Sequence, residues 1–222
     1  MSSLVLAPVM VAVAYWVGWP FVALWTLAAC VVLWEWSALV RRGGTRTLVS
    51  FAAWMIAGLL YAGVLLIGPV ILRGDAVFGF VSMIFLFAVV WGTDAFAYFV
   101  GRALGGPKLM PAVSPKKTWS GAVGGTLGAI VAGLIVARIA GVAVTPALGG
   151  IALLLSVVSQ GGDLIESAVK RHFGAKDASH LIPGHGGVMD RLDGFLTAVL
   201  AAAMVGLLRG GLDAPAQGLL IW

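Results

Sequence analysis

Charged residues and cysteine are both scarce in this sequence. Asp, Glu, Lys and Arg together account for 10% of its 222 residues, whereas 61% are hydrophobic and the mean hydropathy is +1.05. A soluble globular domain carries about 25% charged residues, so the composition excludes that class and points to lipid as the solvent. The single cysteine, Cys30, excludes an intramolecular disulfide and a site built from several thiolates.

Long apolar segments take the place of the missing charges. A helix needs about 20 apolar residues to cross the hydrocarbon core of a bilayer. Segments near this length predict an all-α, polytopic membrane protein with about seven transmembrane helices, within a range of six to eight. The predicted spans are residues 4–18, 21–40, 48–72, 76–100, 120–140, 146–169 and 192–208. The first is short, and Trp19-Pro20 after it is compatible with either a turn or a kink.

The first segment lacks the basic start and the small-residue cleavage site of a secretory signal, so we expect it to stay as a membrane anchor. We divide the chain into residues 1–75, helices for packing and for dimer or lipid contacts, and residues 76–222, a catalytic membrane region with polar loops facing the cytosol. The glycines of one helix face predict close helix packing. They are Gly121, Gly124, Gly125 and Gly128.

The basic residues predict how the helices are oriented. Eleven Lys and Arg residues fall in alternate loops on one side and three on the other, and the positive-inside rule assigns the richer side to the cytosol. We therefore expect a protein of the cytoplasmic (inner) membrane with a cytosolic amino terminus. The net charge of +5 does not indicate nucleic acid as a partner, because the basic loops are short and lack a recognition module. Membrane lipid headgroups or a nucleotide suit them better.

Five carboxylates lie in or beside the predicted spans, all at the expected cytosolic end. They are Asp94, Asp163, Glu166, Asp190 and Asp193. A charge in hydrocarbon costs roughly 2.5–3.5 kcal/mol, which indicates a functional reason for keeping them. Asp163, Glu166 and Lys170 follow an i, i+3, i+7 spacing and share one helix face. Helix capping is an alternative for Asp190 and Asp193, but it does not explain the acids of the preceding span. Two acidic helix ends at one depth suit a hard divalent cation such as Mg²⁺.

Basic residues and glycines around these acids predict a site for phosphates. Lys108, Ser114, Lys116 and Lys117 come from one loop, and Lys170, Arg171 and Lys176 from another. Lysine binds phosphate oxygens as a point charge, and arginine binds them as a fork. The glycines of residues 184–187 add backbone N–H groups for an anion nest. A purely topogenic role is the alternative for the basic loops, and we favour it for Arg41, Arg42 and Arg46. For Glu35, between two tryptophans, we weigh a role in anchoring the membrane interface against a role in catalysis, and we favour anchoring.

These residues form a pattern that resembles a known signature. It includes Ser167-Ala168-Val169-Lys170-Arg171, Lys176-Asp177 and Ile182-Pro183-Gly184-His185-Gly186-Gly187-Val188-Met189-Asp190-Arg191-Leu192-Asp193. The sequence is similar to the phosphatidate cytidylyltransferase family, also called CDP-diacylglycerol synthases. Two further stretches agree, Asp94-Ala95-Phe96-Ala97-Tyr98 with Gly101-Arg102, and Lys108-Leu109 with Ser114-Pro115-Lys116-Lys117-Thr118. The resemblance therefore covers the chain from Asp94 onward. One departure is Ser120, where the family pattern has a glutamate.

The resemblance implies that CTP and phosphatidate react to CDP-diacylglycerol and diphosphate, with Mg²⁺ and, as a second ion, a monovalent cation such as K⁺. It implies catalytic roles for Asp163, Lys170, Asp190, Arg191 and Asp193, with Asp163 and Asp190 as the metal ligands. The implied substrate-binding residues are Lys108, Ser114, Lys116, Lys117, Arg171, Lys176, His185, Gly186 and Gly187. Asp94, Glu166 and Asp177 would hold the ligands and lysines in place. The family also implies a homodimer, which the glycine faces permit.

Other functions stay open from the sequence. A cytidylyltransferase for another lipid phosphate would need the same groups, because the motif residues suit phosphates and a metal ion and do not distinguish acyl chains. An ion-coupled transporter also keeps acids within its spans, but its charged sites usually lie near the bilayer midplane. The acids of this sequence lie at the expected cytosolic end of the spans instead. An isoprenoid transferase uses paired aspartates, but it lacks the His-Gly-Gly and Ser-Pro-Lys-Lys elements found here.

Overall fold

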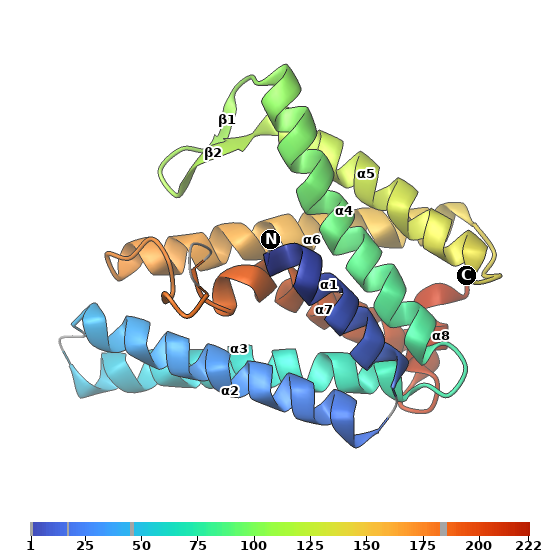
Figure 1. Cartoon of the computed structure of the whole chain (residues 1–222), viewed down its shortest axis with the longest axis horizontal. Coiled ribbons are helices and arrows are strands. Elements are labelled where there is room, and N and C mark those ends of the chain that lie inside the picture. The colour runs from blue at the N-terminus through green and yellow to red at the C-terminus, as the bar shows by residue number, and fades with distance from the viewer. Residues whose placement is uncertain (1, 17, 45–46, 183–185) are drawn as a thin grey trace.

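Helices dominate the computed structural model, which describes residues 2–16, 18–44, 47–182 and 186–222 (Figure 1). The helices are α1 (Ser2–Tyr15), α2 (Trp19–Arg42), α3 (Leu48–Gly74), α4 (Gly79–Leu104), α5 (Trp119–Ile139), α6 (Pro146–His172), α7 (Met189–Gly210) and α8 (Pro215–Leu220). Within the described residues, six of them, α2 to α7, are long and apolar enough to span a bilayer. The all-α, polytopic fold is confirmed, and the number of spans lies within the predicted range of six to eight.

The first predicted span is a short helix. The 14 residues of α1 extend about 21 Å at 1.5 Å per residue, less than the ~30 Å of a hydrocarbon core. A new helix begins at Trp19, because Gly18 has a φ of +95° and Pro20 takes a first-turn position, where its missing N–H is tolerated. The Trp-Pro pair therefore marks a turn between two helices.

A short antiparallel hairpin replaces the loop expected between the fourth and fifth predicted spans. Strand β1 (Lys108–Met110) pairs with β2 (Ser114–Thr118). Thr118 ends β2 and caps α5, because its hydroxyl accepts a hydrogen bond of 3.1 Å from the Gly121 N–H. The two adjacent lysines of β2 therefore lie on a strand whose end is fixed to a helix.

Glycines bring the backbones of α4 and α5 into contact. A Cβ atom added at Gly121 would lie 2.8 Å from the Ala97 carbonyl oxygen, and one at Gly125 would lie 2.7 Å from the Thr93 carbonyl oxygen. Only glycine permits this approach without a shift of the backbone. The predicted packing role of this glycine face is confirmed, and the hairpin lies next to the carboxyl-terminal end of α4, the helix that carries Asp94.

The interior of the bundle combines aromatic packing with a small polar network. Trp25 of α2 stacks on Phe195 of α7 with 5.1 Å between ring centroids. The hydroxyl oxygens of Thr93 and Ser156 lie 2.8 Å apart, and Ser156 also lies 3.4 Å from Thr126. These contacts join α4, α6 and α5 by hydrogen bonds that cannot be replaced by water in lipid. Hydropathy alone did not predict them.

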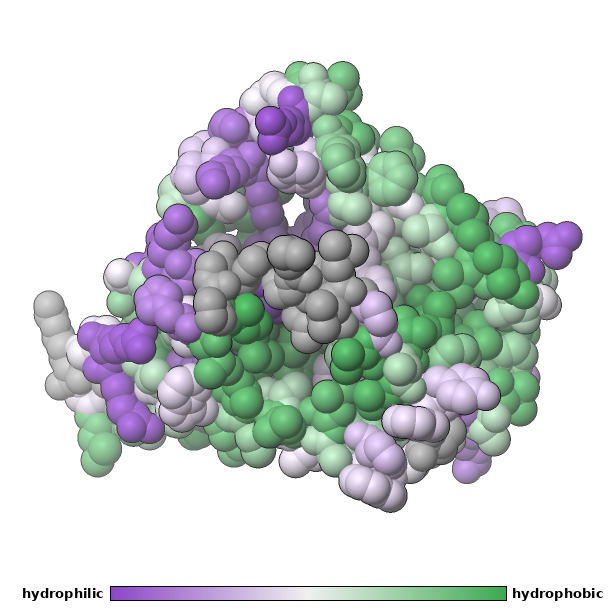
Figure 2. Space-filling model, in the orientation of Figure 1, coloured by the Kyte–Doolittle hydropathy of each residue, from purple (hydrophilic) through white to green (hydrophobic). Residues whose placement is uncertain are grey.

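Polar residues gather at one end of the molecule. Figure 2 shows hydrophilic residues over the hairpin and the neighbouring ends of α2 and α6, with a hollow beside the hairpin, while hydrophobic residues cover most of the remaining face. Helices α2, α4 and α6 end here, and α3, α5 and α7 begin here. This common end holds the predicted site residues.

Candidate active site

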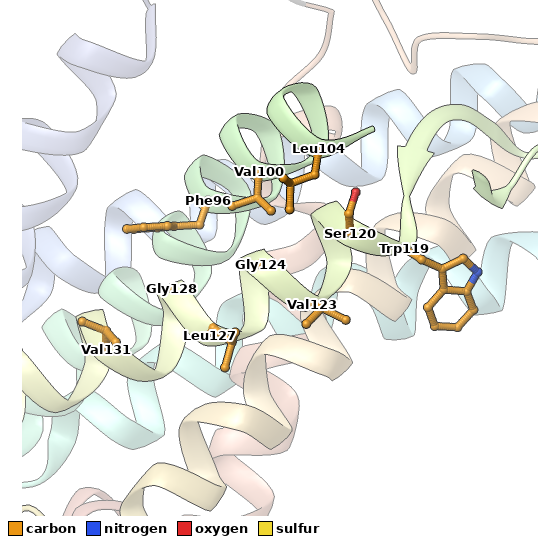
Figure 3. Close-up of a pocket in the computed structure, with 10 residues that line it drawn as sticks. All are labelled: Phe96, Val100, Leu104, Trp119, Ser120, Val123, Gly124, Leu127, Gly128 and Val131. Atoms are coloured by element: carbon orange, nitrogen blue, oxygen red, sulfur yellow. The ribbon is translucent and has the colours of Figure 1, made fainter. Parts of the chain in front are cut away.

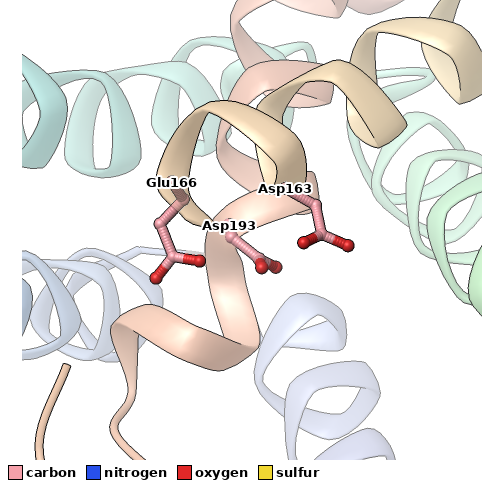
Figure 4. Close-up of side chains that lie close together, drawn as sticks. All are labelled: Asp163, Glu166 and Asp193. Carbon is pink, nitrogen blue, oxygen red and sulfur yellow. The ribbon is translucent and has the colours of Figure 1, made fainter. Parts of the chain in front are cut away.

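Three carboxylates from two helices come together at this end (Figure 4). Asp163 and Glu166 lie on α6 and Asp193 lies on α7, and one oxygen of each lies within 4.8 Å of the others. Glu166 is buried, and its Oε1 atom receives no hydrogen bond from a donor among the described residues. Carboxylates at this separation repel one another, so the group favours a bound cation or a proton. We call these three residues the acid cluster.

Lys170 neutralises part of this charge from inside the bundle. Its side chain is 10% exposed, and its Nζ atom lies 2.9 Å from Glu166 Oε2 and 2.6 Å from Asp190 Oδ1. The first ion pair spans one turn of α6, as the sequence spacing predicts, and the second joins α6 to α7. A buried ammonium group is tolerated only when it is paired. Lys170 therefore fixes two acidic helix ends relative to each other.

Asp190 has a different environment from the acid cluster. Besides Lys170, its carboxylate accepts hydrogen bonds from the N–H groups of Ala178 at 3.0 Å and Gly187 at 2.7 Å. These contacts hold the segment between α6 and α7 against the first turn of α7. The predicted pair of metal ligands is thus divided, because Asp163 belongs to the acid cluster whereas Asp190 contacts this segment and Lys170. A metal role of Asp190 stays a prediction.

Lys117 connects the hairpin to the acid cluster. Its ammonium group forms a salt bridge with the Asp163 carboxylate, which links β2 to α6. The two side chains are 29% and 28% exposed, so the pair is accessible from solvent. Asp94 of α4 is exposed and lies within electrostatic range of Asp163, Lys117 and Arg191. Elements α4, β2, α6 and α7 therefore all contribute charges to one site.

The other predicted binding residues surround this centre. Lys108, Lys116, Arg171, Lys176 and Asp177 are exposed, and Ser114 and Gly186 are half-buried. Arg171 donates a hydrogen bond of 3.0 Å to the Ala175 carbonyl oxygen. The Gly187 N–H binds Asp190, so one donor of the predicted anion nest is already occupied by a carboxylate of the protein. His185 lies outside the described residues. The roles in substrate binding stay predictions.

Glu35 of α2 is buried, so the prediction that it anchors the membrane interface is wrong. Its exposed fraction is 0%. It accepts hydrogen bonds from the Ser179 hydroxyl at 2.6 Å and from the N–H groups of Val188 at 3.0 Å and Met189 at 2.7 Å. A single acid between two tryptophans looks like a boundary residue in the sequence. The hydroxyl and N–H groups that donate to its carboxylate lie more than 140 residues further along the chain.

An apolar groove of about 630 Å³ runs along α4 and α5 and ends beside the hairpin (Figure 3). Phe96 and Val100 of α4 and Leu127 of α5 line it, and Ser120 lies toward its hairpin end. The Ser120 hydroxyl donates a hydrogen bond to the Gly105 carbonyl, so the position where the family pattern has a glutamate carries a neutral contact here. Apolar surface therefore reaches the base of the basic hairpin.

The fold and the site define a polytopic helical membrane protein with a cluster of acids and lysines at one end. The Cytidylyltransferase family matches residues 45–208, a range that contains the acid cluster, Lys170 and the hairpin. The chain belongs to this family.

Relatives named phosphatidate cytidylyltransferase include proteins from three bacterial genera. One from Brucella suis biovar 1 is 53% identical over 166 residues, which cover 75% of this chain and 62% of the relative. One from Bacillus subtilis is 38% identical over 171 residues, 77% of this chain and 62% of the relative. One from Staphylococcus saprophyticus is 40% identical over 146 residues, 65% of this chain and 55% of the relative. The chain thus spans less than two thirds of the length of these relatives.

Proposed function

We propose that this protein is a magnesium-dependent phosphatidate cytidylyltransferase, which converts CTP and phosphatidate into CDP-diacylglycerol and diphosphate. The observation that carries the proposal is the acid cluster beside Lys117 and Lys170. Acids that suit a divalent cation and lysines that suit phosphates meet at one end of a membrane bundle. The names of the relatives support the particular reaction.

The acid cluster fits the chemistry of Mg²⁺. This ion takes oxygen ligands, usually one or two carboxylates together with substrate phosphates. Asp163 and Asp193 offer such oxygens from two helices, and the buried Glu166 has an oxygen that receives no hydrogen bond from the part of the chain that the structure describes. When bound, the ion would offset the negative charge of the triphosphate and of the leaving diphosphate. We propose Asp163 as a ligand of this Mg²⁺ ion. We also propose Asp190 as a metal ligand and K⁺ as a second cation of the site.

The reaction asks for little acid–base chemistry from the protein. The phosphate of phosphatidate is ionised at neutral pH, and one of its oxygens attacks the α-phosphorus of CTP. A new P–O bond forms there, and the bond to the departing diphosphate breaks. The obstacle is repulsion between two anions, so positioning and neutralisation contribute most of the catalysis. Lys117 and Arg191 would neutralise phosphate oxygens, while Lys170 holds Asp190 and Glu166 in place.

A lipid substrate suits the position of the site. We propose that the polar end faces the cytosol from the inner membrane, so that CTP arrives from water while phosphatidate arrives from the inner leaflet. The apolar groove beside the hairpin offers a surface for acyl chains there. An ion-coupled transporter is less favoured, because Asp190 and Asp193 lie in the first turns of α7 and Asp163 pairs with a solvent-accessible lysine of the hairpin, whereas transporter sites usually lie near the bilayer midplane. The glycine face of α5 packs on α4, so it gives no support to the homodimer, which stays a prediction.

An incorporation assay tests the proposal. Purified protein in nanodiscs that contain phosphatidate should transfer label from [α-³²P]CTP to chloroform-soluble lipid when Mg²⁺ is present. We expect little transfer with ATP, GTP or UTP, with EDTA, or with diacylglycerol in place of phosphatidate. Label on a prenyl phosphate but not on phosphatidate would favour the other lipid acceptor. Absence of label with every lipid phosphate would contradict a cytidylyltransferase.

A further inference from the structure

Helix α7 receives its amino-terminal cap from a different helix. The first N–H groups of a helix have no partner within the helix, and the N-cap residue of α7, Val188, supplies no side-chain hydrogen bond. Glu35 of α2 supplies it instead. Its Oε1 atom accepts from the Val188 N–H at 3.0 Å, and its Oε2 atom accepts from the Met189 N–H at 2.7 Å.

The fit around Glu35 is close on every side. The Ser179 hydroxyl donates to Oε1 at 2.6 Å, so three donors surround a carboxylate with an exposed fraction of 0%. A Cβ atom at Gly187 would lie 2.3 Å from Oε1, so the contact requires glycine at that position. Three hydrogen bonds thus satisfy both oxygens of a buried carboxylate, which a buried polar group requires. Glu35 is therefore held firmly against the start of α7.

This start of α7 carries the acids of the candidate site. Asp190 and Asp193 lie in the first turns of α7, and Asp190 accepts the Gly187 N–H. Glu35 accepts the next two N–H groups along the chain. Asp190 and Glu35 together thus accept hydrogen bonds from three consecutive N–H groups, those of Gly187, Val188 and Met189.

We propose that Glu35 is a positioning residue of the site, which sets the place of Asp190 and Asp193 by capping α7 and does not itself touch a substrate. The inference rests on the proposed function. The family match begins at residue 45 and does not include Glu35.

The hydrogen bonds to the two oxygens of Glu35 predict how its replacement by glutamine would act. Both atoms accept hydrogen bonds, whereas glutamine offers one acceptor and one donor. In Glu35→Gln, one N–H of the α7 start would face an amide NH₂ group and lose its acceptor. We therefore expect Glu35→Gln to behave almost as Glu35→Ala does. Ser179→Ala removes the hydroxyl that donates to Glu35 and accepts from the Leu181 N–H, but it leaves the two N–H groups at the α7 start with their acceptors. It should therefore have a smaller effect in the same direction.

Hydrogen exchange of the protein in nanodiscs, titrated with Mg²⁺, measures this role without relying on turnover. In wild type we expect Mg²⁺ to protect peptides from the first turns of α7. In Glu35→Gln these peptides should exchange about tenfold faster without Mg²⁺, and half-maximal protection should need about tenfold more Mg²⁺, because loss of residues that orient metal ligands typically costs 10–100-fold in affinity. The same shift should appear in the Mg²⁺ dependence of cytidylyl transfer. Trp34→Phe, at an exposed neighbouring position on α2, is the matched control.

The outcomes separate the possibilities. Unchanged exchange and an unchanged Mg²⁺ requirement in Glu35→Gln would overturn the inference. Faster exchange with an unchanged Mg²⁺ requirement would make Glu35 a folding contact only and would overturn it as well. If wild type transfers no label to any lipid, the proposed function fails, and the exchange titration still decides whether Glu35 positions the acids. If Glu35→Gln does not fold, the milder Ser179→Ala gives the same comparison.

Discussion

The two ends of the bundle both carry charged residues, but they satisfy these charges in different ways. At the end away from the candidate site, Arg73 donates hydrogen bonds to the backbone carbonyls of Ala14 at 2.6 Å and Tyr15 at 3.3 Å. Arg209 lies over the Trp222 ring, 3.5 Å from its centroid. Both arginines therefore interact with neutral groups of the protein, namely backbone carbonyls and an aromatic ring. In the acid cluster, by contrast, carboxylates face one another.

Asp75 shows the contrast most clearly. Its carboxylate accepts hydrogen bonds from the N–H groups of Val77 at 3.0 Å, Phe78 at 2.8 Å and Gln217 at 3.0 Å. It thereby ties together the end of α3, the start of α4 and the start of α8. Asp163, at the other end, pairs with Lys117 and otherwise lies beside two more acids. Asp75 thus completes the fold at its end of the bundle, whereas the acids that face each other at the other end are arranged for a ligand.

Removal of the buried lysine should have the largest effect. Lys170→Met would leave Glu166 and Asp190 without their shared cation, and the loss of one partner of a buried ion pair destabilises by about 3–5 kcal/mol. We expect a strong fall in the melting temperature in detergent, together with loss of activity. Lys176→Met is the matched control, because Lys176 is exposed and such changes stay within about 0.5 kcal/mol. Equal melting temperatures for the two variants would show that Lys170 does not hold the helix ends together.

Asp163→Asn should separate activity from stability. Asp163 is 28% exposed and pairs with a lysine of similar exposure, so the amide should change the free energy of unfolding by less than about 1 kcal/mol. Turnover should fall by about 100-fold or more, since loss of a group that binds charge in the transition state costs 10²–10³-fold. Cytidylyl transfer and thermal unfolding of the same preparation measure the two effects. Near-normal transfer would remove Asp163 from the proposed site.

The helical fold follows closely from the sequence, because lipid imposes a simple rule on length and hydropathy. Six of the seven predicted spans correspond to helices long enough to cross a bilayer. The first falls short because α1 has 14 residues. The shared face of Asp163, Glu166 and Lys170 also follows from the helical period alone. Periodicity cannot find the hairpin, because strands of three and five residues leave almost no pattern.

The details of the site depend on contacts between distant segments. Asp190 and Asp193 are three residues apart on one helix, yet one contacts Lys170 and the other joins the acid cluster. This division depends on where the segment before α7 folds back, and spacing does not encode it. Glu35 is the stronger case, since its partners follow it by more than 140 residues. A clue was present in the sequence, because an acid within an apolar span needs donors from somewhere.

The two neighbouring lysines of β2 offer a finer test of the site end. Lys117 is half-buried and pairs with Asp163, whereas Lys116 is exposed. Lys117→Met should lower kcat/KM for CTP about tenfold, equal to 1.4 kcal/mol of transition-state stabilisation. Lys116→Met should lower it by about threefold or less, because an exposed charge is screened by salt. Initial rates over a range of CTP concentrations provide the comparison, and a larger loss at Lys116 would reverse the proposed roles.

The smallest effect is expected at Asp75, where the pH dependence of stability gives the test. Burial alone would raise the pKa of the Asp75 carboxyl, but the backbone N–H groups of Phe78, Gln217 and Val77 outweigh it and lower the pKa from its ordinary value of 3.8. The ionised form therefore stabilises the fold. This contribution is complete above the ordinary pKa and is lost as the pH falls through the lower pKa of the folded state.

Asp75→Asn cannot ionise, so it should lack this contribution at every pH. At pH 7 we expect a loss of about 1 kcal/mol, the usual value for removing a capping acceptor, with cytidylyl transfer per folded molecule unchanged. The difference in melting temperature between wild type and variant should shrink once the pH falls below about 4. A constant difference from pH 7 to pH 3 would mean that shape, and not charge, explains the role of Asp75. A fall in turnover without a fall in melting temperature would break the contrast between the two ends, because an acid bound only to backbone N–H groups far from the site would then act in the reaction.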